Sequence, residues 1–201
     1  MERKESIINK FEKAGLVTVV VIWLLRAVFG PDFNFALLVT TTVLSVYYLW
    51  FGFFIFNKLR PWDLIHRHIR QSINRFAVVT GILMGVIISQ TLIAIIFGFY
   101  LFPGTQTVVT ISAIVLLLFT GFLVIVQIID KKSRPHCNRY YLRAGLLGIF
   151  LLLLWLVPLE TRLEILYKDY PEFRAAYIEY VNNPDCERAI QKLRDERSRF
   201  R

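Results

Sequence analysis

The longest uninterrupted hydrophobic pattern in the chain runs from Phe76 to Ile129, 54 residues without a single Asp, Glu, Lys, Arg or His. A soft break from Phe102 to Thr107, which contains Pro103 and Gly104, divides this stretch into halves of about 25 residues. A bilayer core of roughly 30 Å is crossed by about 20 helical residues that rise 1.5 Å each. The pattern therefore predicts two membrane-crossing helices joined by a tight turn.

Similar apolar segments follow one another along the whole chain. They cover about Ala14 to Phe29, Phe33 to Phe56, Phe76 to Leu101, Thr107 to Ile129 and Tyr140 to Leu159. Short turns join the first segment to the second and the third to the fourth, so each pair is expected to form an antiparallel hairpin. The predicted fold class is an all-α, polytopic membrane protein with four or five transmembrane helices.

The fifth segment leaves two alternatives open. Its unbroken apolar core, Ala144 to Leu159, has only 16 residues, a length between that of a span and that of a buried helix. Tyr140, Tyr141 and Arg143 can extend it by lying at the interface. We expect it to cross, which gives a transmembrane bundle over residues 1–159 and a helical tail over residues 160–201. The tail is too short to bury a core alone and must pack on the bundle, on a copy or on a partner.

Lys and Arg cluster in the segment before Ala14 and in the loops after the second and fourth segments, whereas both hairpin turns lack them. Positively charged loops stay on the cytoplasmic side, so the N-terminus and both basic loops are expected there, at the inner membrane of a bacterial cell. The first apolar segment lacks a small-residue cleavage site and is interpreted as a retained span, not a removed signal peptide. The net charge of +9 then indicates contact with anionic lipid headgroups of the bilayer, with no nucleic acid as partner.

The loop after the second segment has an amphipathic pattern. Its apolar residues recur at steps of three or four, and most of its arginines fall elsewhere on the same helical wheel. This spacing predicts an amphipathic helix near residues 59–75 that lies in the headgroup region. The residues expected to contact lipid headgroups are Arg60, Trp62, Arg67, Arg70 and Arg75.

Small residues spaced four apart mark three further strips, one at each end of the third segment and one in the fifth. Such strips allow the backbone of another helix to approach closely. They predict either packing within one chain or an interface between copies, and the sequence leaves both open. The residues concerned are Gly81, Gly85, Ser89, Ala94, Gly98, Ala144 and Gly148.

Two polar side chains inside the apolar segments each leave two interpretations open. Gln90, near the midpoint of the third, is expected to make an interhelical hydrogen bond, with a solute pathway as the alternative. Arg26 is expected to reach toward the interface with Asp32 as its partner; the alternative is an inward-facing Arg26 that binds an anion or a lipid headgroup. No Asp or Glu falls within the five segments as drawn, which argues against an ion-coupled transporter.

The sequence lacks the common catalytic and cofactor-binding patterns. It has no G-x-S-x-G, no H-E-x-x-H, no Gly-rich phosphate loop and no C-x-x-C. His66 and His68 are two residues apart and would diverge on a helix, so no metal site is predicted, and no cofactor either. Cys137 and Cys186 are too few for a disulfide scaffold.

These observations predict a non-enzymatic integral membrane subunit that scaffolds, anchors or senses within a larger membrane assembly, as a homo-oligomer or with a membrane-complex partner. The first alternative is a small homo-oligomeric channel or passive transporter lined by Ser, Thr and Gln90. The second is a lipid-binding or lipid-modifying enzyme that uses the basic interfacial loop.

Overall fold

The chain folds into helices, and no strand occurs among the residues that the structure describes, which confirms the all-α fold class. The computed structural model describes residues 7–29, 33–57, 59–66, 75–102, 104–129 and 134–198. Its elements are α1 (Ile7–Phe29), α2 (Asn34–Asn57), the 3-10 helix η2 (Pro61–Leu64), α4 (Arg75–Tyr100), α5 (Thr105–Ile129), α6 (Arg134–Leu156), α7 (Leu159–Leu166), α8 (Pro171–Asn182) and α9 (Glu187–Ser198).

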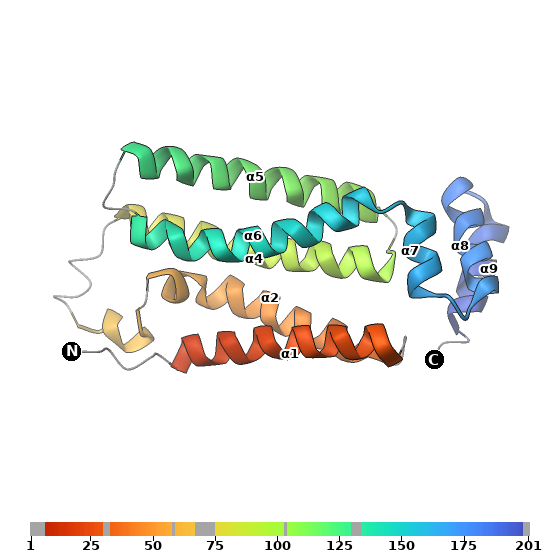
Figure 1. Ribbon diagram of the computed structural model, residues 1–201, viewed down its shortest axis with the longest axis horizontal. Helices are drawn as coiled ribbons and strands as arrows, with labels where there is room; N and C mark the ends of the chain where they lie inside the picture. The colour runs from red at the N-terminus through yellow and green to blue at the C-terminus, as the bar shows by residue number, and fades with distance from the viewer. Residues whose placement is uncertain are drawn as a thin grey trace.

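The long helices α1, α2, α4, α5 and α6 lie side by side, and α7, α8 and α9 gather at one end of this bundle (Figure 1). The chain reverses direction from each long helix to the next, so α1, α4 and α6 all begin at the end opposite α7–α9. Three helices, α2, α4 and α5, are long and apolar enough to cross a membrane, and α6 with α7 adds a fourth if this bent pair is one span. The fold is therefore compatible with membrane insertion, and a crossing by α1 stays a prediction.

The first helix is longer than the apolar pattern indicated. It begins at Ile7 rather than near Ala14, and so includes the charged residues Lys10, Glu12 and Lys13. Glu12 is only 2 % exposed. Glu12 lies before the apolar segment predicted from Ala14, yet it belongs to the same helix and is buried in the bundle, where a charged residue needs a partner.

The helices α2 and α4 make the most extensive contact in the bundle. At its centre the two backbones approach so closely that a methyl group on Gly52 would clash with the Cα of Gly85. One turn further along α4, the hydroxyl groups of Ser45 and Ser89 are 2.8 Å apart, and Ser45 also donates to the Ser89 carbonyl at 3.0 Å. Small residues thus fix the register of this helix pair.

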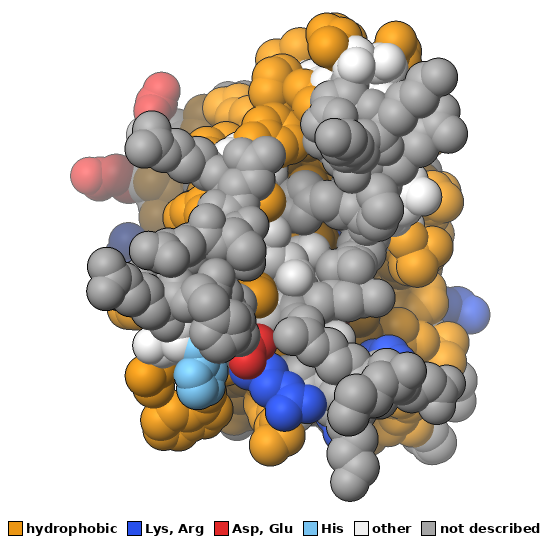
Figure 2. Space-filling view, turned by 90° about the vertical axis from the view of Figure 1, so that its left-hand side faces the viewer, with side chains coloured by type: hydrophobic (Ala, Val, Ile, Leu, Met, Phe, Trp, Pro, Cys, Tyr) orange, Lys and Arg blue, Asp and Glu red, His pale blue; other side chains and the backbone are white. Residues whose placement is uncertain are grey.

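The segment after α2 forms a 3-10 helix where the sequence predicted the start of an amphipathic α-helix. The Asp63 carboxylate accepts a hydrogen bond from the backbone amide of Arg60 at 2.8 Å, which holds the first turn of η2. Trp62 and Ile65 are 73 % and 69 % exposed. Viewed onto this end, hydrophobic side chains show along the top, the right side and the bottom, and a histidine, an acidic side chain and basic side chains lie close together in the lower part (Figure 2). Residues 67–74 of the predicted helix lie outside the described residues.

A sharp bend separates α6 from α7. The two helices meet at 105°, with Pro158 directly before the first residue of α7. Because the Pro158 nitrogen carries no hydrogen, it cannot continue the helical hydrogen bonding of α6. The predicted fifth segment therefore ends a few residues early, at Leu156, and α7 runs across the end of the bundle.

The tail buries a small core of its own, and the bundle supplies one residue of it. Leu101, in the turn between α4 and α5, is fully buried there, and its carbonyl accepts a hydrogen bond from the Tyr177 hydroxyl at 2.6 Å. Leu101 has a φ of 51°, so the chain leaves α4 through a left-handed residue that is usually glycine. The remaining buried members are Leu163, Tyr167, Phe173, Tyr177 and Leu193.

Candidate functional site

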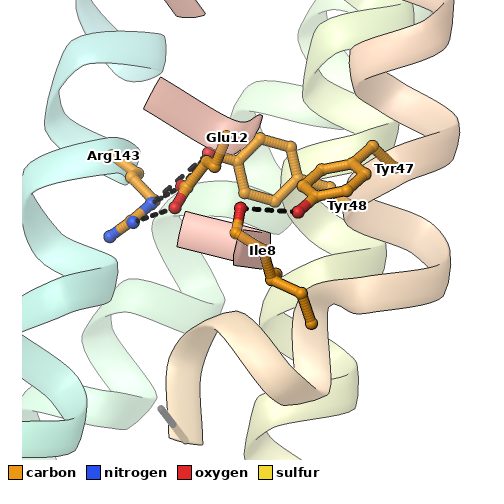
Figure 3. Close-up of polar contacts among 5 residues, drawn as sticks. All are labelled: Ile8, Glu12, Tyr47, Tyr48 and Arg143. Atoms are coloured by element: carbon orange, nitrogen blue, oxygen red, sulfur yellow. Dashed lines mark hydrogen bonds and ion pairs between the residues drawn. The ribbon is translucent and has the colours of Figure 1, made fainter. Parts of the chain in front are cut away.

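A buried ion pair joins the first and last long helices of the bundle. The Arg143 guanidinium on α6 donates from Nε to Glu12 Oε1 at 2.5 Å and from Nη2 to Glu12 Oε2 at 2.8 Å. This two-bond arrangement is the geometry in which a guanidinium binds a carboxylate most strongly. Figure 3 shows the pair between α1 and α6, and the Glu12 side chain is only 3 % exposed.

The middle helix α2 completes this site with two neighbouring tyrosines. The Tyr48 hydroxyl donates to Glu12 Oε1 at 2.5 Å and accepts from Arg143 Nε at 3.3 Å. The Tyr47 hydroxyl donates to the Ile8 carbonyl, one turn earlier on α1, at 2.7 Å (Figure 3). The Phe56 ring lies beneath the guanidinium, 5.3 Å from Cζ to the ring centroid. Three helices are thereby connected through one carboxylate.

This arrangement is suited to holding helices together. Glu12 is the only acidic residue in the five long helices, and both of its oxygens already accept hydrogen bonds. The pair is neutral as a unit, whereas removal of either partner would leave an uncompensated buried charge, at a cost of about 3 to 5 kcal/mol. In this arrangement the carboxylate binds Arg143 and Tyr48.

Arg26 lies inside the bundle and not at its surface. It is 8 % exposed, its Nε donates to the Asn34 side-chain oxygen, and its Cζ lies 5.5 Å from the centroid of the Phe99 ring. Arg26 thus contacts the first residue of α2, just after the hairpin turn, and an aromatic face of α4; its position relative to a membrane interface stays a prediction. The expected partner Asp32 lies outside the described residues.

The small-residue strips face other helices of the same chain. Gly81 and Gly85 lie against α2: a methyl group on Gly81 would lie 2.5 Å from Asn57 Nδ2, and one on Gly85 would lie 2.6 Å from the Tyr48 carbonyl oxygen. Gly98 meets Leu154 of α6, at 2.6 Å for the same added methyl. The other strip members are buried or face a neighbouring helix, namely Ser89, Ala94, Ala144 and Gly148, the last of these toward Leu116 of α5.

For the other predicted site residues the structure gives less information about their roles. Gln90 is half-buried on α4, between the buried Ser89 and Thr91. Arg60 and Trp62 are exposed at the end where α1, α4 and α6 begin, as headgroup contacts would be. Arg67 and Arg70 lie outside the described residues, and so does the Arg75 side chain. Headgroup contact by this loop stays a prediction.

The sequence analysis did not identify Glu12 or Tyr48 as site residues, and it did not predict that Arg143 pairs with Glu12. Helices α1 and α6 begin at the same end of the bundle, with Glu12 five residues after Ile7 and Arg143 nine residues after Arg134. Opposite charges in the first three turns of two parallel helices are the signal from which the pairing could have been predicted.

No protein-family model, curated protein or solved structure shows a significant match to the chain.

Proposed function

We propose that this chain is a non-enzymatic integral membrane subunit that scaffolds or anchors a larger membrane assembly. The observation that carries the proposal is the pairing of the charged groups in the bundle. Glu12 is bound by Arg143 and Tyr48, and Arg26 is bound by Asn34. In a transporter or an enzyme, reactive or ion-binding groups face a pathway for ions or substrate. In a scaffold, charged groups can instead pair with one another and hold the helices in a fixed arrangement.

The outer surface of the bundle supports the membrane part of this proposal. Large apolar side chains on α5 and α6 are widely exposed, among them Leu117 at 73 % and Leu142 at 70 %. Lipid or an apolar partner would cover such a surface. We propose that the protein lies in the inner membrane, with the N-terminus and the basic loops in the cytoplasm and α7–α9 on the opposite side.

The attachment of the tail suggests where a partner would bind. Because Leu101 of the bundle belongs to the tail core, α8 and α9 are held in a fixed position at the end of the bundle. The exposed face of α9 carries charges of both signs, including Arg188 and Arg194. A fixed and charged helical surface beside a membrane suits a polar docking contact with a second protein.

The alternative of a small channel gains little support from the described contacts. Ser45 and Ser89 hydrogen-bond each other between α2 and α4, and the Thr91 hydroxyl donates to the Ile87 carbonyl of its own helix at 2.8 Å. These hydroxyls are used for packing within one chain.

The experiment is to purify the full chain from its own membranes in a mild detergent and to measure the mass of the particle by native mass spectrometry. A different subunit in fixed stoichiometry is expected. The double charge reversal Arg188→Glu and Arg194→Glu should release it, while Lys10→Glu, exposed at the other end of the bundle, should retain it. A chain that purifies alone, or a closed ring of identical chains that conducts ions in liposomes, would overturn the proposal.

A further inference from the structure

A cavity of about 520 Å³ lies at the end of the bundle where the tail is attached. Three parts of the chain line it: the start of α5 with Thr105 and Gln106, the α6–α7 bend with Trp155 and Arg162, and α8 with Tyr180 and Val181. This volume falls in the range typical of small-molecule sites. None of the described lining residues is a carboxylate.

The unusual member of this lining is Arg162. It is only 7 % exposed, and its Nε and Nη1 atoms are buried without a hydrogen-bond partner among the described residues. A buried guanidinium without a counter-charge is costly, and such groups are nearly always paired in folded proteins. Glu12 and Arg143 show how the same chain satisfies a buried arginine elsewhere. The missing partner of Arg162 therefore points to a ligand.

The other side of the cavity favours the same kind of ligand. Gly104, Thr105 and Gln106 form the N-terminal end of α5, a helix of 25 residues. The first backbone amides of a helix and the helix dipole make such an end favourable to an anion, and here the Thr105 amide already donates to the Phe102 carbonyl at 3.1 Å. Arg162 and the start of α5 thus place two independent positive features around one cavity.

We propose that this cavity binds a phosphate group carried on an apolar body. A guanidinium matches the tetrahedral oxygens of a phosphate with two parallel hydrogen bonds. The apolar wall, which includes Trp155, Pro158 and Val181, suits the rest of such a molecule. The helix α7 crosses the end of the bundle beside it. The inference does not depend on the scaffold role, which concerns the face of α9.

The test measures the thermal unfolding of the full-length protein in detergent with four additives: inorganic phosphate, phosphatidylglycerol, phosphatidylcholine and diacylglycerol. Phosphate-containing additives should raise the unfolding temperature, and diacylglycerol should not. A shift with inorganic phosphate identifies a soluble phosphate as a sufficient ligand. A shift with the phospholipids alone identifies the headgroup as the source, because the acyl chains are then required.

Variants separate this site from general lipid effects. Arg162→Gln removes the charge and should weaken binding about tenfold or more, while Arg162→Lys should weaken it less. Gln106 is exposed, so Gln106→Glu should leave the fold intact and weaken binding by repelling the phosphate. Gln127→Glu, the same change near the far end of α5, is the matched control and should bind like the wild type.

Two results would overturn the proposal. One is the absence of any shift with inorganic phosphate and with both phospholipids. The other is a shift that persists unchanged in both Arg162→Gln and Gln106→Glu. Because Arg162 has no described partner to lose, Arg162→Gln should unfold without additive at a temperature no lower than the wild type. If it fails to fold, Gln106→Glu still decides the question.

Discussion

Glu12 and Arg143 are 131 positions apart in the sequence, yet they form a two-bond ion pair that closes the bundle between its first and last long helices. Tyr48 of α2 binds both partners, so the contact includes three helices. In surroundings of low polarity such a pair gives specificity of arrangement more than net stability, because both charges must first lose their water. The effect of the pair on stability is measured most directly by replacing one of its two residues.

Replacement of Glu12 by Gln should lower the free energy of unfolding by about 3 to 5 kcal/mol, because Arg143 then loses the carboxylate that compensates its charge. The measurement is reversible unfolding in mixed micelles with increasing dodecyl sulfate. Lys10→Gln is the matched control: Lys10 is exposed on the same helix, and its replacement should change stability by less than about 0.5 kcal/mol. Equal stability of Glu12→Gln and wild type would show that the pair contributes nothing.

The double variant Glu12→Gln and Arg143→Gln makes a sharper version of this test. Each single change leaves one buried charge behind, whereas the double change leaves none. The double variant should therefore lose less stability than the sum of the two single variants, with a coupling of about 0.5 to 3 kcal/mol. Additive losses would mean that the two residues act independently, contrary to their contact.

The boundaries of three long helices could be predicted from the sequence, because the absence of charge can be judged at each position without knowing which residues lie near it in space. The boundaries of α2, α4 and α5 follow the apolar pattern closely, since each residue of a span must tolerate lipid or core by itself. The start of α1 could not be found in this way. Glu12 is buried in the bundle together with its partner Arg143, and a rule based on each residue alone therefore began the first segment too late.

The sequence also could not predict which helices the small-residue strips contact. Spacing identifies Gly81 and Gly85 as members of a flat helix face, but it does not show which helix that face meets. The docking of the tail depends on a backbone carbonyl, that of Leu101, and a carbonyl leaves no mark in a sequence. The unpaired state of Arg162 is likewise a property of three segments brought together in space.

The contact between α2 and α4 gives the next prediction. A methyl group on Gly85 would lie 2.6 Å from the Tyr48 carbonyl oxygen and 2.9 Å from the Cα of Gly52. Since these are backbone atoms that cannot move away singly, Gly85→Ala should destabilise the bundle by about 1 to 3 kcal/mol. The measurement is again reversible unfolding in mixed micelles, together with the particle mass.

Gly121 offers the matched control on α5, because nothing lies within 4 Å of a methyl group added there. Gly121→Ala should be neutral or stabilise the protein by up to about 1 kcal/mol, the difference in helix propensity. If Gly85→Ala instead changed the number of chains in the particle and left its stability unaltered, the glycine strip would belong to an interface between copies.

The hydrogen bond between Tyr177 and Leu101 gives a prediction about the tail. Tyr177→Phe keeps the ring in the tail core but leaves the buried Leu101 carbonyl without this donor. The cost should be about 1 to 3 kcal/mol, concentrated in the attachment of α7–α9. Amide hydrogen exchange should therefore become faster in α8, while exchange in α2 and α4 stays as in the wild type.

Tyr180→Phe is the control for this change, because it removes a hydroxyl from a half-buried tyrosine on the same helix while its ring contact with Tyr177 remains possible. Exchange in α8 should stay at the wild-type rate in this variant. Faster exchange throughout the bundle in Tyr177→Phe would mean that the tail and the bundle unfold as a single unit.

The two cysteines allow the topology to be tested without a truncation. Cys186 is exposed in the tail, whereas Cys137 is buried, so an impermeant maleimide should react with Cys186 alone. If α6 crosses the membrane, Cys186 should react in right-side-out vesicles and not in inverted ones. Lys10→Cys in a Cys186→Ser background marks the opposite end of the bundle and should react only in inverted vesicles, because Lys10 is exposed near the start of α1. If Cys186 reacted only in inverted vesicles and Lys10→Cys only in right-side-out ones, the orientation would be opposite to the proposed one. If both positions reacted in the same kind of vesicle, the tail would lie on the same side as the basic loops.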